Sequence, residues 1–241
     1  MIKLIITSLI ALLLVGQNSL AADSDPLTEL LRLRLGTESI TEPVATPIDG
    51  VFQTRFGDKF AYLIDGGRYV LIGDLIDLKT AKNLTESSRR SLISDEINKV
   101  SLDSLTIFPA DNEEKAVLNV FTDTSCGYCQ KLHEEVKYLQ EAGISVRYFP
   151  YPRGGAQGPG YSDLKKVWCS DDRQRAMNIA KGVNYGELGS DDCEAASFID
   201  EGHRLGNLIG VTGTPALYTS SGEKFNGYVP YKQLIPRLLN N

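Results

Sequence analysis

Hydrophobic positions follow two different spacings in the first third of the chain. Residues 25–36 begin with an Asp-Pro pair, a typical helix start, and carry leucines three or four positions apart. Short apolar runs at 51–56, 60–64 and 69–72 are separated by turn residues, which is typical of strands. The pattern predicts a short helix followed by three strands, and therefore a small α+β unit that extends from residue 23 to residue 82.

The segment 73–78 looks like one more strand of this unit. It could pair with the same segment of a second subunit, because exposed strand edges accept partners. Its aspartates favour the alternative, an ordinary edge strand protected by charge. A unit of roughly 60 residues holds only a marginal core by itself, so association into a homodimer is a reasonable way to stabilise it.

The middle of the chain is polar, with a thin apolar stripe at helical spacing from residue 83 to about 104. We interpret 83–112 as a helical linker. The continuous apolar run 116–122 then predicts a strand buried in the middle of a sheet. A second, larger unit therefore occupies residues 113–241, and the fold class is α+β with two domains.

The first 22 residues have the layout of a secretory signal peptide. Lys3 precedes an apolar run from Leu4 to Val15, and a small and polar stretch ends in Ala21-Ala22. We expect cleavage after one of these two alanines. Export would place the four cysteines of the chain in an oxidising compartment.

Composition and charge exclude some functions. With 42% hydrophobic and 23% charged residues the chain is typical of a globular protein. The net charge of −6 comes without a dense basic cluster, so nucleic acid is not an expected partner. His133 and His203 lack metal-ligand spacing, and we expect neither a metal nor a cofactor.

A cysteine pair follows the predicted buried strand directly. Cys126-Gly127-Tyr128-Cys129 leads into a helical stretch that continues from Gln130. The first turn of a helix stabilises a thiolate at Cys126, and thiolate is the attacking species in disulfide exchange. Cys129 lies three positions on, over the same face, and could resolve a mixed disulfide formed at Cys126. Redox chemistry fits this pair better than a structural disulfide or half of a zinc site.

Thr214-Pro215 stands at the start of a later predicted strand. With the upstream dithiol it makes the chain resemble the thioredoxin superfamily, in which a cis-proline packs beside the dithiol and the preceding residue binds substrate. An ordinary trans turn proline is the alternative. Gly127 and Tyr128 add no charge next to Cys126, which favours isomerase or reductase work over strong oxidation. We expect these four residues to contact substrate.

Two polar residues near the dithiol have open roles. His133 is either a solvent-facing helix residue, which we favour, or a proton carrier one turn beyond Cys129. Asp123 either relays protons to Cys129 or shapes the loop. Thioredoxins resemble one another in having a buried acid where this chain has Val120, so any proton relay here must use other groups.

The whole layout resembles the periplasmic disulfide isomerases of the DsbC type. The resemblance includes the leader, the small N-terminal domain, the linker, the dithiol and several short matches around it, among them Trp168-Cys169 and Gly213-Thr214-Pro215. It implies a V-shaped homodimer that acts on misfolded, disulfide-scrambled exported proteins and receives electrons from a DsbD-type membrane protein. Gln130 departs from the histidine of the family pattern. A reductase or oxidase of the same architecture and a holdase chaperone are the alternatives.

Cys169 and Cys193 fall in a helical insertion between the two parts of the dithiol site. Their wide spacing and the resemblance both suggest that they form a structural disulfide with each other. A second redox centre is the alternative function for this pair.

Overall fold

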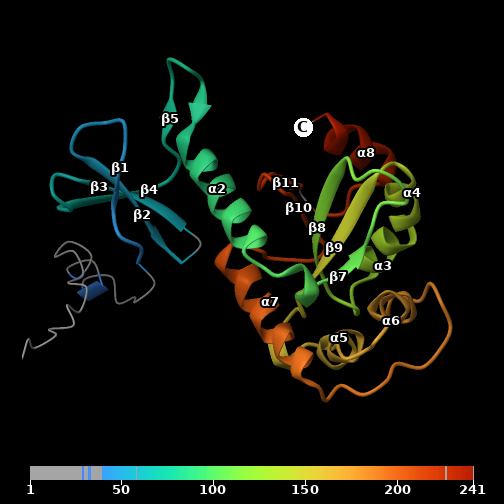
Figure 1. Cartoon of the computed structure of the whole chain (residues 1–241). Coiled ribbons are helices and arrows are strands. Elements are labelled where there is room, and N and C mark those ends of the chain that lie inside the picture. Colours follow the sequence, from blue (N-terminus) through green and yellow to red (C-terminus); the bar gives the residue numbers. More distant parts are fainter. Residues whose placement is uncertain (1–28, 30–31, 34–39, 58, 226, 241) are drawn as a thin grey trace, which may run out of the picture.

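The computed structural model describes residues 29, 32–33, 40–57, 59–225 and 227–240 (Figure 1). The predicted leader and most of the predicted helix at 25–36 lie outside these residues. Figure 1 shows a small sheet on one side, a larger mixed unit on the other, and the helix α2 (Leu84–Asn98) between them.

The small sheet has four antiparallel strands in chain order: β1 (Val44–Ala45), β2 (Val51–Phe56), β3 (Lys59–Ile64) and β4 (Tyr69–Ile72). The three strands predicted in this region are confirmed, with β3 beginning one residue early. The turn between β3 and β4 places Asp65, Gly66 and Gly67 at φ of 53°, 61° and 85°. Positive φ explains why glycines occupy two of these positions.

The expected strand at 73–78 is shorter than predicted. Only β5 (Ile76–Asp77) forms, and it pairs with β6 (Lys82–Asn83) of the same chain. β4 is instead the edge of the four-stranded sheet, and all four of its apolar side chains are exposed. Exposed apolar edge strands of this kind can accept another strand.

α2 begins at a capped end. The side chain of Asn83 accepts a hydrogen bond from the Glu86 N–H at 2.9 Å, which satisfies a backbone donor of the first turn. The helix stops at Asn98, although we expected it to continue to about 104. Ser101 is extended at φ −60° and ψ 135°, and Leu102–Ser104 forms a separate 3-10 turn. Serine and aspartate compete with the backbone for hydrogen bonds, so they favour such a break over a helix interior.

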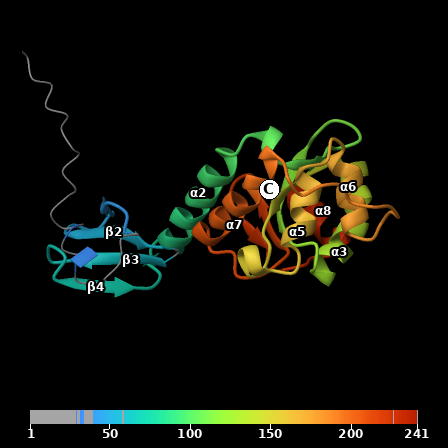
Figure 2. The same ribbon diagram turned by 90° about the horizontal axis from the view of Figure 1, so that it is seen from below.

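α2 is anchored to both units of the molecule. The buried hydroxyl of Thr85 contacts the Tyr62 hydroxyl and accepts a hydrogen bond from Leu75 N–H at 2.8 Å. Further along, Ile93 and Ile97 pack into a core of the larger unit. Figure 2 shows α2 lying beside α7 (Phe198–Leu208).

The larger unit is built on a five-stranded sheet of order β11-β10-β8-β9-β7. Its strands are β7 (Thr106–Phe108), β8 (Ala116–Thr122), β9 (Ile144–Pro150), β10 (Ala216–Thr219) and β11 (Lys224–Phe225). β8 is the central strand, parallel to β9 and antiparallel to β10, as its apolar sequence predicts. β7 comes from the segment expected to be linker, so this sheet begins at Thr106.

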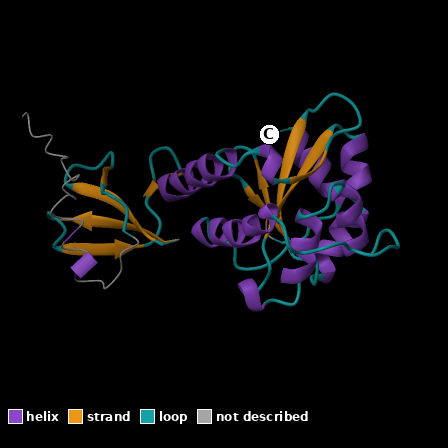
Figure 3. Ribbon diagram, turned by 60° about the horizontal axis from the view of Figure 1, so that its bottom comes forward, coloured by secondary structure: helices purple, strands orange, loops and turns teal. Residues whose placement is uncertain are grey.

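Helices cover both faces of this sheet (Figure 3). Leu118 and Val120 of β8 face one core, and Phe121 faces the opposite core with α2 and α7. The remaining helices are α3 (Gly127–Glu134), α4 (Val136–Glu141), α5 (Tyr161–Trp168), α6 (Arg173–Ala180) and α8 (Tyr231–Leu239). α5, α6 and α7 form the helical insertion between β9 and β10. Within the described ranges, every helix is too short or too polar to cross a membrane.

Candidate active site

The dithiol lies where the central strand meets a helix. β8 ends at Thr122, a short loop follows, and Cys126 is the N-cap residue of α3. The carbonyl oxygen of Cys126 accepts hydrogen bonds from the N–H groups of Cys129 and Gln130, each at 3.0 Å. Both cysteines are free thiols, with 3% of Cys126 and 1% of Cys129 exposed. The junction predicted from the sequence is therefore present.

Thr214 and Pro215 lie against Cys126, 88 positions later in the chain. Their peptide bond is cis. The Cys126 thiol donates to the Thr214 carbonyl oxygen at 3.2 Å. The Thr214 hydroxyl is buried and, among the described residues, has no hydrogen-bond partner. It can donate to Cys126 once that sulfur is a thiolate, when the thiol proton is gone.

The two sulfurs differ strongly in acidity. The Cys129 thiol, as a hydrogen-bond donor, lowers the pKa of Cys126 to about 5 against the opposing effect of burial. The Thr214 hydroxyl, the Cys129 main-chain amide and the Arg153 charge act in the same direction. Burial, followed by the hydrogen bond to Cys126, raises the pKa of Cys129. Cys126 is therefore the more acidic thiol and is ionised at neutral pH, whereas Cys129 stays protonated.

Asp123 holds the loop before the dithiol. Its buried carboxylate accepts hydrogen bonds from the N–H and hydroxyl of Ser125, each at 2.8 Å. The Arg153 main-chain N–H at 2.8 Å and its Nε at 3.1 Å complete the set. Burial raises the pKa of this carboxyl, but these hydrogen bonds outweigh it and the net pKa is lowered. A Cβ at Gly160 would lie 2.0 Å from Asp123 Oδ1, so only glycine fits there. These contacts support the loop-shaping role.

His133 is not a solvent-facing residue, and that prediction was wrong. The side chain is 4% exposed and lies between Tyr148 and Asn178, with hydrogen bonds of 2.8 Å to each. Because Asn178 Oδ1 can only accept, Nε2 carries the proton and Nδ1 accepts from the Tyr148 hydroxyl. Burial lowers the pKa of His133 to about 4, so the ring is neutral at physiological pH. Helical spacing did not reveal that this face of α3 is covered by α6.

Lys181 was missed by sequence reasoning. It follows α6 directly, and its side chain is buried, with 2% exposed. Nζ donates to Thr122 Oγ1 at 2.8 Å and to the Asp123 carbonyl oxygen at 2.7 Å. Burial lowers its pKa to about 8, while negative charge on Cys129, Asp123 and Cys126 opposes that change. Lysine is almost always exposed, so the sequence contains no signal for this position.

The open side of the dithiol carries Gly127 and Tyr128. A side chain at Gly127 would meet nothing within 4 Å, and Tyr128 is 63% exposed. The Tyr128 ring stacks on Tyr228 with 5.9 Å between ring centres. Gln130, which departs from the family pattern, donates from Nε2 to the Thr124 carbonyl oxygen at 3.2 Å. Of the residues expected to contact substrate, Gly127 and Tyr128 are thus exposed beside the buried Cys126, and Thr214 contacts its thiol.

The second cysteine pair is bonded. Cys169 and Cys193 form a disulfide with 5.7 Å between their Cα atoms. Cys169 caps the C-terminal end of α5, and Cys193 precedes the 3-10 turn Glu194–Ser197. In the part of the chain that the structure describes, no group of three His, Cys, Asp or Glu side chains is placed to hold a metal ion.

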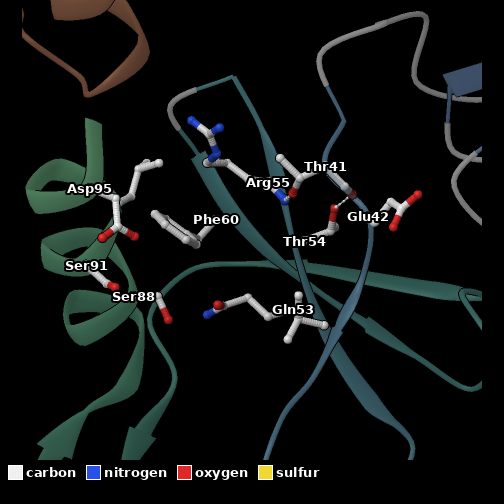
Figure 4. A pocket seen from close by; sticks show the side chains of 11 residues that line it. Thr41, Glu42, Gln53, Thr54, Arg55, Phe60, Ser88, Ser91 and Asp95 are labelled. Atoms are coloured by element: carbon white, nitrogen blue, oxygen red, sulfur yellow. Dashed lines mark hydrogen bonds between the residues drawn. The ribbon is translucent and has the colours of Figure 1, made fainter. Parts of the chain in front are cut away.

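A cavity of about 310 Å³ lies apart from the dithiol, between the small sheet and α2 (Figure 4). Its lining side chains come from β1, β2, β3 and α2 and from the segment before β1, and none is a cysteine. They are Thr41, Glu42, Val44, Gln53, Thr54, Arg55, Phe60, Ser88, Ser91, Leu92 and Asp95.

A central parallel strand, a dithiol at the following helix start and a cis-proline beside it define a thiol–disulfide oxidoreductase of the thioredoxin fold. A family model described as a thioredoxin-like domain matches residues 105–240. A second, described as the disulfide bond isomerase protein N-terminal domain, matches residues 18–86. This chain belongs to the DsbC family of thiol:disulfide interchange proteins.

Individual relatives agree with this assignment. The chain is 33% identical over 234 residues to thiol:disulfide interchange protein DsbC of Dickeya dadantii, covering 95% of this chain and 93% of the relative. It is 27% identical over 222 residues to DsbC of Escherichia coli, covering 92% and 90%. A disulfide interchange protein from Neisseria gonorrhoeae has a similar fold, with a TM-score of 0.50 and 24% identity over 58% of this chain and 99% of that one. The expected family and two-part α+β fold are confirmed.

Proposed function

We propose that this protein is a periplasmic disulfide isomerase in which Cys126 attacks non-native disulfides and Cys129 resolves stalled complexes. The observation that carries this proposal is that the pKa values of the two thiols shift in opposite directions. The pKa of Cys126 is lowered to about 5 and that of Cys129 is raised. One sulfur is therefore ready to attack at neutral pH, and its neighbour stays protonated until it is needed.

The reaction begins with attack of the Cys126 thiolate on one sulfur of a substrate disulfide. A mixed disulfide forms, and the other substrate sulfur leaves as a thiolate. That thiolate attacks another disulfide of the same substrate, and a substrate sulfur finally displaces Cys126. No net oxidation or reduction has occurred, and the wrong disulfide has been exchanged for another.

A stalled complex takes a different path. Cys129 attacks the Cys126 sulfur, the Cys126–Cys129 disulfide forms, and the substrate leaves as a reduced thiol. The protein has then lost two electrons to the substrate, so an external dithiol must reduce it. A DsbD-type membrane protein is the proposed donor, because the family resemblance implies one.

Substrate contacts are proposed around Cys126, on the side that carries Gly127 and Tyr128. The main chain at Thr214 offers hydrogen bonds to an extended segment, and Pro215 lines a hollow of about 280 Å³ beside it. Tyr128 offers a flat exposed ring next to Gly127. Such contacts bind backbone and apolar surface without reading one sequence, which suits a range of unfolded substrates.

We also propose a homodimer formed through the small N-terminal sheet. The support is the edge strand β4, whose side chains Tyr69, Val70, Leu71 and Ile72 are all exposed. A free edge with an apolar surface is a site for pairing with a second copy. Mass in solution tests this: we expect twice the mass of the mature chain, and a monomer would contradict it.

Refolding of scrambled ribonuclease tests the catalytic assignment. Cys126→Ser should lose the activity, because the attacking thiolate is gone. Cys129→Ser is the matched control, since it keeps the nucleophile but should accumulate mixed disulfides with the substrate. Recovery of ribonuclease activity by Cys126→Ser at the wild-type rate would contradict the proposal.

The redox state in the cell distinguishes an isomerase from an oxidase of the same fold. Thiol trapping of the native protein should find Cys126 and Cys129 mostly reduced. A fully oxidised pair would favour an oxidase. A chaperone activity can coexist with either, and suppression of aggregation by a Cys126→Ala, Cys129→Ala variant would reveal it.

A further inference from the structure

The resolving step requires a thiolate at Cys129, and the surroundings of this sulfur disfavour one. Its thiol is 1% exposed, and burial raises its pKa. In the mixed disulfide Cys126 carries no charge, so repulsion between the two sulfurs disappears but burial remains. A buried thiolate needs a compensating positive charge or hydrogen-bond donors.

The buried face behind Cys129 contains one such charge. Lys181 Nζ binds the carbonyl oxygen of Asp123 at 2.7 Å, and the main-chain N–H of the same Asp123 stabilises the Cys129 thiolate. The charge of Lys181 also lowers the pKa of Cys129. Two hydrogen bonds hold the ammonium in place, from Nζ to Asp123 and to Thr122.

Other ionisable groups around Cys129 do not supply this charge. His133 is neutral above about pH 4, and burial raises the pKa of Tyr148 well above its usual value, which keeps it neutral. The Asp123 carboxylate is negative and is bound by Ser125 and Arg153. The Arg153 guanidinium is positive, but its side chain is 46% exposed, so water screens it.

We propose that the Lys181 ammonium stabilises the Cys129 thiolate during resolution of the mixed disulfide. This inference rests on the proposed function, because it assigns a helper to its resolving step. Lys181 is a positioning residue that acts through Cys129.

The step balances without another reactant. The Cys129 thiol loses its proton to solvent while the nitrogen of Lys181 keeps its own. The resulting thiolate attacks Cys126 Sγ and forms the Cys126–Cys129 bond. The bond from Cys126 to the substrate sulfur breaks, and its electron pair leaves with the substrate thiolate, which takes up a proton.

An aromatic disulfide that releases a coloured thiolate follows both steps in one stopped-flow trace. The reduced protein should release a first equivalent when Cys126 attacks and a second when Cys129 resolves. Lys181→Met should slow the second phase about tenfold at neutral pH and move its pH inflection up by about one unit, since one pKa unit is a tenfold change in thiolate. The first phase should change by less than about twofold, because Cys126 has its own stabilising contacts.

Three matched variants distinguish the effect of the Lys181 charge from an effect of the substitution on the structure. Lys181→Gln keeps hydrogen-bond donors without charge and should behave like Lys181→Met, whereas Lys181→Arg should keep the second phase. Lys115→Met removes an exposed lysine at the opposite end of β8 and should change neither phase. A wild-type second phase in Lys181→Met, or in Lys181→Gln alone, would overturn the proposal.

Two further measurements keep the test decisive. Cys129→Ser should lose the second phase, and if it does not, the resolving role fails independently of Lys181. If neither Lys181→Met nor Lys181→Gln folds, the pH dependence of the second-phase rate in the wild-type protein provides the test. An inflection at or below the ordinary cysteine value of about 8.5 supports the proposal, and a rate that still rises at about pH 10 contradicts it.

Discussion

The two cysteine pairs of this molecule show how the end of a helix decides what a thiol does. Cys126 precedes α3 and Cys169 follows α5, and both helices have eight residues. The positive N-terminal end of α3 favours a thiolate at Cys126, while the negative C-terminal end of α5 disfavours one at Cys169. Cys126 is a free thiol, whereas Cys169 is held in a disulfide.

The partners of the two pairs differ as well. Cys129 lies on the first turn of the helix that Cys126 caps, whereas Cys193 comes from 24 positions beyond Cys169. Because Cys126 and Cys129 are close in sequence, a disulfide between them can form and break within one rigid site. The disulfide between Cys169 and Cys193 closes a long loop of the insertion and stabilises it.

Removal of the insertion disulfide should have the largest effect on stability and little effect on chemistry. A Cys169→Ser, Cys193→Ser variant should lose about 3.5 kcal/mol of unfolding free energy, the loop-closure value for about 25 residues. Urea unfolding measures the loss, and alkylation of Cys126 measures the chemistry. A large fall in the alkylation rate of the folded variant would show that the pairs are not separate.

The dithiol should make stability depend on pH in the reduced protein only. The pKa of Cys126 is about 5 in the folded state and near 8.5 when unfolded, so the unfolded chain binds the extra proton between these values. This stabilisation is complete above the unfolded pKa and is lost as pH falls through about 5. His133 titrates in both redox forms, so its contribution to the pH dependence cancels in the difference between them.

The stability of the reduced form relative to the oxidised form should therefore rise by roughly 2 kcal/mol from pH 5 to pH 7. Urea unfolding of both forms at the two pH values measures this rise. The Cys169–Cys193 bond is present in both forms and serves as an internal control. If the difference in unfolding free energy between the two forms did not change with pH, Cys126 would not be a thiolate.

Removal of the Arg153 charge should have a smaller effect, on the pKa of Cys126. This charge lowers the pKa of Cys126, and Arg153→Gln keeps donors for Asp123 without that charge. We expect the pKa of Cys126 to rise by up to about one unit, so that alkylation at pH 5 slows by up to about fivefold. Arg175→Gln, which removes an exposed arginine of α6, is the control and should leave the rate unchanged.

The Thr214 hydroxyl should give the smallest of these effects. Thr214→Val keeps the shape of the side chain and the carbonyl contact but removes the donor, so the pKa of Cys126 should rise by about half a unit. The pH dependence of thiolate absorbance measures this shift. A fall in the pKa would show that the hydroxyl does not donate to the sulfur.

The sequence predicts what depends on local pattern. Residues 116–122 are continuously apolar and form β8 with those bounds, and the turn glycines mark the hairpin between β3 and β4. The end of α2 was placed about six residues too late, because a thin apolar stripe continues past the point where Ser101 breaks the backbone.

What depends on distant packing could not be predicted. His133 looks like a surface residue of α3 until Asn178 of α6 is placed over it. Lys181 sits at the end of a mostly polar helix, and only the fold brings its ammonium under Thr122 and Asp123. Arg153 reaches the dithiol loop from the segment after β9, a contact that spans 30 positions. Motifs identified the two thiols, whereas the charges around them come from tertiary structure.

Trapping with an alkylating reagent and mapping the labelled cysteines by mass tests the central claim most directly. In the reduced dithiol form of the folded protein at about pH 6, Cys126 should be labelled first and Cys129 only after unfolding, because Cys126 alone is a thiolate there. Cys169 and Cys193 should stay unlabelled until a strong reductant is added to the unfolded chain. Labelling of Cys129 as fast as Cys126, or of Cys169 in the folded protein, would contradict the account.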